Sequence, residues 1–142
     1  MSKSNAYETD ILGLLFNATA ISLVADDTAT TPLTNLYLAL HSSDPGEAGT
    51  QTTNEVAYTS YARVAVARTS GGFTVSGNSV VLAADVDFPA CTGSTATATH
   101  FSIGSLTSGA GKIFYSGTVT PNISISTGVT PRLTTGTTIT ED

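Results

Sequence analysis

The sequence predicts a mainly β fold, an antiparallel β-sandwich of the jelly-roll kind with one N-terminal α-helix. Three observations support this. Short apolar segments alternate with polar residues, and turn signals separate them at intervals of about eight to twelve residues. Only one segment, near the N-terminus, has a helical period, so no alternation of helix and strand suggests a parallel sheet. The chain has 142 residues, a length that suits a single domain with a core of its own.

The helix is expected over residues 4–18. Ser4 or Asn5 can cap its first turn, and Asn5 followed by Glu8 resembles a capping box. At about 100° per residue the apolar side chains cover an arc of about 200°, and they are Tyr7, Ile11, Leu12, Leu14, Leu15, Phe16 and Ala18. So wide an arc fits a helix that lies in a groove of its own domain, or one that also packs on a neighbouring subunit. We therefore expect an N-terminal arm and helix over residues 1–19 and one β-sandwich domain over residues 20–142.

Residues 35–66 hold two strong strand signals and the longest polar connection between them. Leu36, Leu38 and Leu40 alternate with more polar neighbours, which predicts a strand with one face in the core. The sequence Asp-Pro-Gly at residues 44–46 predicts a turn, because aspartate can accept a hydrogen bond from the backbone two residues on. The chain is expected to extend again from residue 55 to residue 68.

Further short strands are expected before and after this pair. They are residues 20–25, two strands within 73–84 joined at Gly77-Asn78, a short apolar piece at residues 86–88, residues 98–103, residues 112–116, a segment around residues 123–125 and a final strand over 132–140. The sequence 105–111 is a glycine-bearing connection.

Charge and cysteine content exclude several classes of protein. Only 11% of the residues are charged and the net charge is −6, with basic residues scattered at Lys3, Arg63, Arg68, Lys112 and Arg132. No basic stripe exists to neutralise phosphates, so we expect no nucleic-acid binding. No secretory signal or membrane span is expected, because no apolar run approaches about 18 residues. The single cysteine, Cys91, excludes an intrachain disulfide and suits a small buried residue.

Residue types that carry chemistry occur without the spacing that chemistry requires. His41 and His100 are interpreted as strand residues at an interface, and Asp85 with Asp87 as a solvated strand edge rather than a glycosidase or calcium pair. Asp26, Asp27, Asp44 and Glu47 form a weak calcium candidate, Ser102 and Ser105 lack a nucleophile elbow, and residues 104–112 only resemble a phosphate-binding loop. We therefore predict no catalytic residues, no metal and no cofactor.

Three long strings also carry a family resemblance. LYLALHSSDPGEAGTQTTNEVAYTSYARVAV, then ATATHFSIGSLTSGAGKIFYSG and the C-terminal GVTPRLTTGTTITED, resemble a family of small structural proteins of tailed bacteriophages. Its members are labelled tail-fibre-like or capsid decoration (cement) proteins. The resemblance implies a jelly-roll-like sandwich and a non-enzymatic role in the virion.

The role expected first is capsid decoration on the outer surface of the shell. The partners would be the major capsid protein and the chain itself, as a dimer or trimer, because few charges and a wide apolar helix suit such contacts. The negative charge favours the outside of the shell, away from packaged DNA. A tail or tail-fibre protein is the alternative, and a carbohydrate-binding module using Tyr58 and Tyr61 is a third. The candidate interface residues are Tyr7, Ile11, Leu14, Leu15, Tyr58 and Tyr61.

Overall fold

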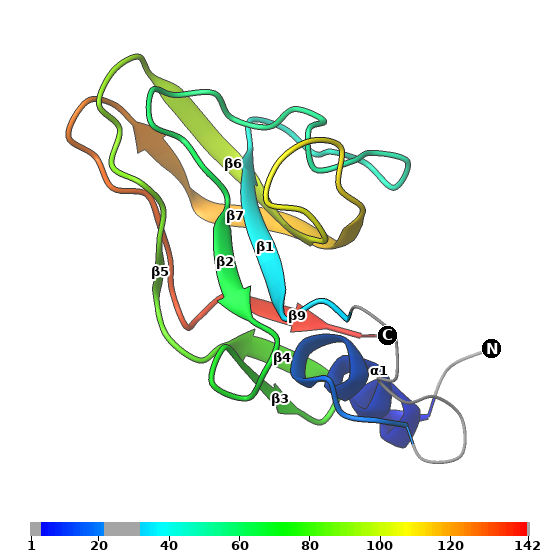
Figure 1. The fold of residues 1–142 in the computed structure, drawn as a ribbon. Helices are drawn as coiled ribbons and strands as arrows, with labels where there is room; N and C mark the ends of the chain where they lie inside the picture. The colour runs from blue at the N-terminus through cyan, green and yellow to red at the C-terminus, as the bar shows by residue number, and fades with distance from the viewer. Residues whose placement is uncertain (1–3, 22–31, 142) are drawn as a thin grey trace. The chain divides into compact units, whose positions relative to one another are not determined.

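The computed structural model describes residues 4–21 and 32–141. It is mainly β, with antiparallel sheets and a single N-terminal helix (Figure 1), which confirms the predicted fold class. The elements are α1 (Asn5–Asn17), β1 (Asn35–His41), β2 (Val64–Ala67), β3 (Phe73–Ser76), β4 (Ser79–Leu82), β5 (Val86–Asp87), β6 (Ala96–Gly104), β7 (Ile113–Ile125), β8 (Arg132–Leu133) and β9 (Thr138–Thr140). The strands form sheets in the orders β2-β1-β6-β7, β3-β4-β9 and β5-β8.

Contacts divide the chain into two compact units. Unit 1 comprises Met1–Asn35, Val66–Asp85 and Leu133–Asp142, and unit 2 comprises Leu36–Ala65 and Val86–Arg132. Neither unit is one continuous stretch of sequence, so each depends on segments that are distant along the chain. The expected division of the chain at residue 19 stays a prediction.

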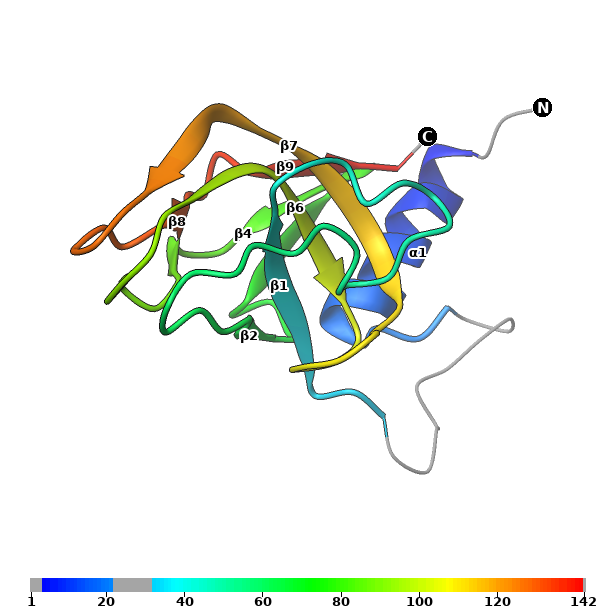
Figure 2. The ribbon, with the colours of Figure 1, turned by 90° about the horizontal axis from the view of Figure 1, so that it is seen from above.

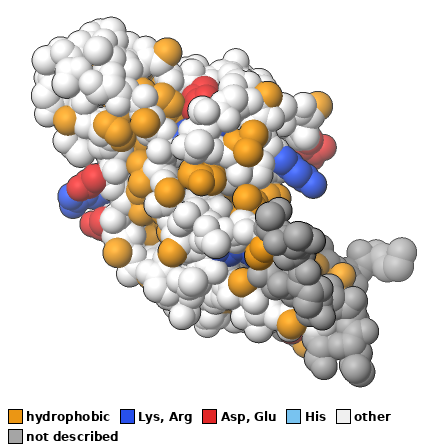
Figure 3. All heavy atoms as spheres, viewed as in Figure 1, with side chains coloured by type: hydrophobic (Ala, Val, Ile, Leu, Met, Phe, Trp, Pro, Cys, Tyr) orange, Lys and Arg blue, Asp and Glu red, His pale blue; other side chains and the backbone are white. Residues whose placement is uncertain are grey.

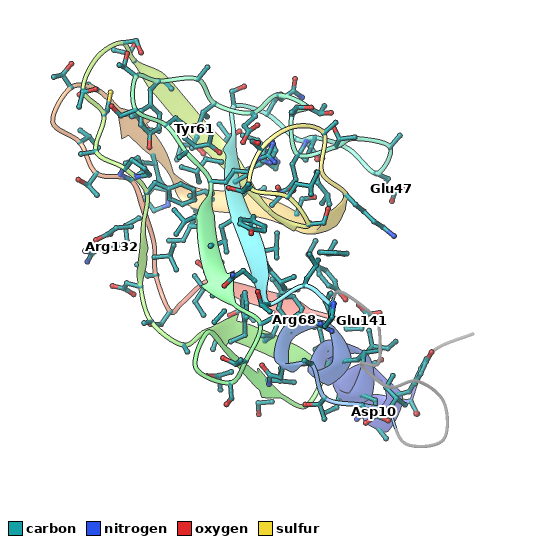
Figure 4. The ribbon with its side chains drawn as sticks, in the orientation of Figure 1. Asp10, Glu47, Tyr61, Arg68, Arg132 and Glu141 are labelled. Atoms are coloured by element: carbon teal, nitrogen blue, oxygen red, sulfur yellow. The ribbon has the colours of Figure 1, made fainter. Side chains whose placement is uncertain are left out.

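In unit 1, both ends of α1 are closed by polar contacts. Ser4 is the N-cap, and its hydroxyl accepts a hydrogen bond from the backbone N–H of Tyr7 at 3.4 Å. Ala18 ends the helix in the left-handed conformation, with φ at 53°. The guanidinium of Arg68 donates to the carbonyls of Leu14 and Leu15 at 2.5 and 2.6 Å, and Figure 4 shows Arg68 beside α1. A cation therefore satisfies carbonyls that the last turn leaves without intrahelical partners.

The core of unit 1 forms where α1 packs on the β3-β4 hairpin. Leu12 and Phe16 are fully buried, and the ring of Phe16 meets Phe73 edge to face at 4.9 Å. Gly77 turns the hairpin with φ at 59°, at the predicted position. The buried face of α1 differs from the predicted apolar arc. Tyr7, which belongs to the arc, is 45% exposed, whereas the polar residue Glu8 is buried.

In unit 2, β1 and β7 flank β6 (Figure 2). Strand β1 was expected to bury one face, yet Leu38, Ala39, Leu40 and His41 are all fully buried. Leu36, Leu38 and Leu40 are buried as predicted, and Ala39 and His41 on the other face are buried as well. The alternation did not predict this, because the second face is met by residues from the segment after β1, where the carbonyl of Thr53 lies 2.8 Å from His41 Nδ1.

Strand lengths differ from the sequence prediction in three places. The segments expected at residues 112–116 and 123–125 belong to the single strand β7, in which residues 119–122 oppose only Thr99. The expected strand 132–140 is divided into β8 and β9 by a turn at residues 134–137. The extended segment from residue 55 shortens to β2, since Ser60 has φ at 80° and interrupts it. The strand expected at residues 20–25 lies mostly outside the described residues.

The contact between α1 and β3 leads to a stability prediction. Phe16→Ala removes a fully buried ring and its edge-to-face partner, so we expect the free energy of unfolding to fall by about 3–5 kcal/mol. Tyr7→Ala on the exposed side of the same helix is the control, with an expected change within about 0.5 kcal/mol. Urea unfolding of both variants measures the difference, and equal losses would contradict the packing described.

Candidate functional site

Two connecting segments of unit 2 lie side by side, residues 42–55 after β1 and residues 105–112 between β6 and β7 (Figure 1). We call them the paired loops. A β-bridge joins Thr50 to Lys112, and the backbone N–H of Gln51 donates to the carbonyl of Gly111 at 2.9 Å. The predicted turn is present, because Asp44 Oδ1 accepts from the N–H of Gly46 at 2.8 Å. Loops of this kind, on a strand scaffold, are where binding residues most often occur.

Gln51 fixes the paired loops from inside. Its side chain is fully buried, with Nε2 donating to the carbonyl of Tyr37 at 3.1 Å and Oε1 accepting from the N–H of Leu106 at 3.0 Å. Side chains at positions 104 and 111 would collide with this amide, which explains the two glycines there. Both polar ends of the amide are thus satisfied, as burial requires.

Arg63 and Glu55 form an ion pair beneath the paired loops. Arg63 Nε and Nη2 donate to the two carboxylate oxygens of Glu55 at 2.7 and 2.8 Å, and only 2% of the Arg63 side chain is exposed. The same guanidinium donates to the carbonyls of Leu106 and Gly109 at 2.9 and 2.8 Å. One buried cation therefore ties residues 105–112 to a carboxylate on the other loop.

Tyr61 and Tyr58 complete this cluster. The hydroxyl of Tyr61 donates to Glu55 Oε1 at 2.9 Å and accepts from the N–H of Leu40 at 3.1 Å, while the hydroxyl of Tyr58 donates to the carbonyl of Pro89 at 2.8 Å. The two rings meet edge to face at 5.3 Å, and Tyr61 stacks on Phe88 at 6.3 Å. Burial raises the pKa of Tyr58 to about 12 and also raises the pKa of Tyr61. Both phenols therefore stay protonated at neutral pH.

An open groove of about 610 Å³ lies over this cluster. Its lining residues are Thr52, Glu55, Val56, Ala57, Tyr58, Thr59, Tyr61 and Ser94. A sugar platform requires an exposed aromatic face, but Tyr58 is only 4% exposed and Tyr61 has one face against Phe88. The carboxylate of Glu55 already accepts from both Arg63 and Tyr61. The groove thus presents threonine and serine hydroxyls, whereas its two tyrosines stabilise the fold through their hydrogen bonds and ring contacts.

His41 is a buried connection between the paired loops and β6. Its Nδ1 lies 2.8 Å from the carbonyl of Thr53 and its Nε2 lies 2.8 Å from Ser102 Oγ. Because a carbonyl only accepts, Nδ1 carries the proton and Nε2 accepts from the serine. Burial lowers the pKa of His41 below its usual value, so the ring is neutral at pH 7. This histidine and serine pair is fully buried and has no access to a substrate.

The other candidates do not gather into a site. His100 bonds its neighbour Thr99 at 2.9 Å, and Asp85 accepts from the N–H of Thr135 at 3.0 Å. Asp87 forms an exposed bidentate pair with Arg132, which lowers the pKa of that carboxyl. Cys91 is buried and has no disulfide partner. Within residues 4–21 and 32–141 no group of three acidic, histidine or cysteine side chains can hold a metal ion, and Asp26 and Asp27 lie outside these ranges.

The predicted interface residues lie in two separate parts of the chain, on α1 and in the segment between β1 and β2. Tyr7 is exposed on α1, where Ile11, Leu14 and Leu15 are half-buried, whereas Tyr58 and Tyr61 belong to the cluster of unit 2. An interface role for these six residues stays a prediction. None of the described helices is long and apolar enough to cross a membrane.

Sequence reasoning missed Glu55, Arg63 and Gln51 as a set. Arg63 was counted only as one of five scattered cations. The sequence did contain one signal for this cluster, since Arg63 stands at the start of an otherwise apolar strand segment. An arginine that is buried in such a place must find hydrogen-bonding and charged partners.

Removing one partner of the buried pair should destabilise the protein strongly. We expect Glu55→Gln to lower the free energy of unfolding by about 3–5 kcal/mol, because it leaves the Arg63 guanidinium buried without its counter-ion. The double variant Glu55→Gln/Arg63→Met should lose less than the sum of the single variants. Asp87→Asn, at the exposed pair with Arg132, is the matched control and should cost less than about 1 kcal/mol. Additive losses in urea unfolding would contradict the coupling.

His41 should make stability depend on pH. The folded pKa lies below 6.5, so below that pH the unfolded chain binds a proton more readily than the native one. We expect the free energy of unfolding to be constant above about pH 6.5 and to fall below it, by at most about 1.4 kcal/mol per pH unit. His41→Gln should remove this slope and His100→Gln should retain it, as measured by urea unfolding at several pH values. An unchanged slope in His41→Gln would refute the assignment.

Comparison with known proteins gives one family. No curated protein matches the chain. The model of the Gp80 family, described as podophage GP4 fiber I protein gp80, matches residues 2–141. This match covers almost the whole chain and agrees with the resemblance seen in its three long strings. The chain therefore belongs to this family of phage fiber proteins, and it is a structural protein of the bacteriophage virion.

Proposed function

We propose that this protein is a structural subunit associated with the phage tail fibre. The observation that carries the proposal is the family match over residues 2–141, because the family is described by a fiber protein. Capsid decoration, the role expected first from the sequence, receives no comparable support. In both roles the protein lies on the outside of the particle, where its charge of −6 meets no packaged DNA.

The proposed partners are copies of the same chain and neighbouring fibre or tail proteins. A contact among copies that each carry a charge of −6 is favourable only where few charges face one another. The face shown in Figure 3 supports such contacts, since most of it is uncharged and its acidic and basic side chains lie in a few small groups. The major capsid protein, expected as a partner from the sequence, belongs to the decoration alternative, and neither nucleic acid nor membrane has a part in the proposal.

We also infer that the protein performs no catalysis. General acid–base chemistry requires a titratable group that reaches a substrate. His41 is fully buried, and both oxygens of Glu55 are engaged by Arg63. His41 and Glu55, the groups that resemble catalytic residues, thus stabilise the paired loops.

The location in the particle can be tested with antibodies against the purified protein. We expect gold-labelled antibody to mark the tail fibres of intact, DNA-filled particles, and the protein to accompany tails when particles are separated into heads and tails. Antibody against the major capsid protein is the control for the head fraction. Labelling confined to heads would overturn the fibre assignment and favour decoration, and labelling only after disruption would exclude both.

A further inference from the structure

We propose that the paired loops form a pH-dependent conformational switch controlled by His41. When the ring of His41 takes up a proton, the segment 42–54 opens away from β1 and β6 more often, while the strands of both units stay paired. Acid thereby affects this segment before it affects the fold as a whole. The effect belongs to unit 2 by itself, wherever the protein lies in the virion.

His41 connects three parts of unit 2. It is the last residue of β1, its Nδ1 donates to the carbonyl of Thr53 on the first of the paired loops, and its Nε2 accepts from Ser102 Oγ on β6. Both contacts are 2.8 Å long, and the residue is fully buried. The closed loop therefore encloses a neutral imidazole whose two nitrogens both have partners.

The segment 42–54 buries little of its own surface. Its exposed residues are 42–44, 46–48, 52 and 54, and only Pro45 and Gln51 in it are buried. The amide of Gln51, which donates to the carbonyl of Tyr37, and the ring of His41 make buried contacts between the segment and β1. A segment with few buried side chains opens locally at a lower free energy than the whole fold does. Weakening the contact between His41 and Thr53 therefore removes one of the bonds that keep the segment closed.

The surroundings of His41 disfavour a charged ring while the loop is closed. Burial is the largest cause, and it lowers the pKa of His41 below 6.5. Arg63 and His100 lower this pKa further, whereas the carbonyl of Thr53 and the carboxylate of Glu55 raise it. Glu55 is paired with Arg63 at 2.7 Å, so its attraction for a proton on His41 is partly offset by the guanidinium. The other charged residues of the paired loops are exposed, and they are Asp44, Glu47 and Lys112.

His100 strengthens this effect because it lies directly opposite His41 in the register of β1 and β6. Such a pair has Cβ atoms about 4.5–5.5 Å apart on one face of the sheet. A proton on either ring therefore disfavours a proton on the other. In the open form the His41 ring reaches water and regains its ordinary proton affinity. Below about pH 6.5 the open form thus binds the proton more readily, and acid shifts the equilibrium toward it by at most about tenfold per pH unit.

Opening also changes the groove that lies over the tyrosine cluster. Thr52 and Glu55 line this groove, and both lie close to Thr53 along the chain. Movement of the segment 42–54 takes Thr52 away from the wall, whereas Glu55 stays with Arg63. The complete groove therefore belongs to the closed form, which neutral pH favours.

Hydrogen–deuterium exchange of the purified full chain, read by mass spectrometry of its peptides, tests the switch. The measured quantity is the ratio of the wild-type exchange rate to that of His41→Gln at the same pH, because the intrinsic pH dependence of exchange cancels in this ratio. For residues 42–54 we expect the ratio to rise about tenfold between about pH 7.5 and about pH 5. For the β3-β4 hairpin of unit 1 we expect no change.

Two further variants complete the experiment. His41→Asn, whose amide can donate from near the position of Nδ1, replaces His41→Gln if circular dichroism shows that variant to be unfolded. His100→Gln is the matched control, since it retains His41. Its residues 42–54 should still exchange faster in acid, by a smaller factor than in the wild type, because the charge opposite His41 is missing. A ratio at residues 42–54 that stays constant with pH overturns the proposal, and so does an equal rise in every peptide, which would show that the whole fold loosens together.

Discussion

The buried pair of Arg63 and Glu55 is the constraint on which the loops of unit 2 depend. A guanidinium with 2% exposure is tolerable only if its donors all have acceptors, and here they reach one carboxylate and the carbonyls of Leu106 and Gly109. The requirement acts in both directions. The loop at residues 105–112 supplies carbonyls that the cation needs, and the cation holds this loop in a conformation that its glycines alone would not define.

Local signals in the sequence predicted local structure well. The Ser4 cap, the Asp44 turn and the Gly77 hairpin turn each depend on residues within four positions, and all three occur as their chemistry requires. The antiparallel fold class followed from the same kind of signal. Alternation of side chains is sufficient to identify a strand, but it does not say whether the second face is covered. The burial of Ala39 and His41 on the second face of β1 became apparent only when the segment after β1 was placed, with the carbonyl of Thr53 against His41.

The parts that could not be predicted depend on contacts between distant residues. Arg63 meets Leu106 across 43 positions, and Gln51 meets the same residue across 55. No spacing rule links such positions in a single sequence. The continuity of β7 was missed for a related reason. The two strands expected at residues 112–116 and around 123–125 are separated in the sequence by a segment with Gly117 and Pro121, whereas β7 continues through this segment.

The surface carries fewer free charges than the composition suggests, because three of the arginines are buried or bound to other groups of the protein. Arg63 is buried, the guanidinium of Arg68 binds helix carbonyls, and Arg132 pairs with Asp87. Contacts between such surfaces have to come from backbone hydrogen bonds, hydroxyls and apolar atoms, which salt screens little.

The division into units also affects how such contacts can be studied. Deleting residues 1–18 would remove Leu12 and Phe16 from the core of unit 1, so a loss of assembly would report on folding rather than on an interface. Exposed positions such as Tyr7 on α1 and Thr118 on β7 avoid this ambiguity, because their side chains support little of the core.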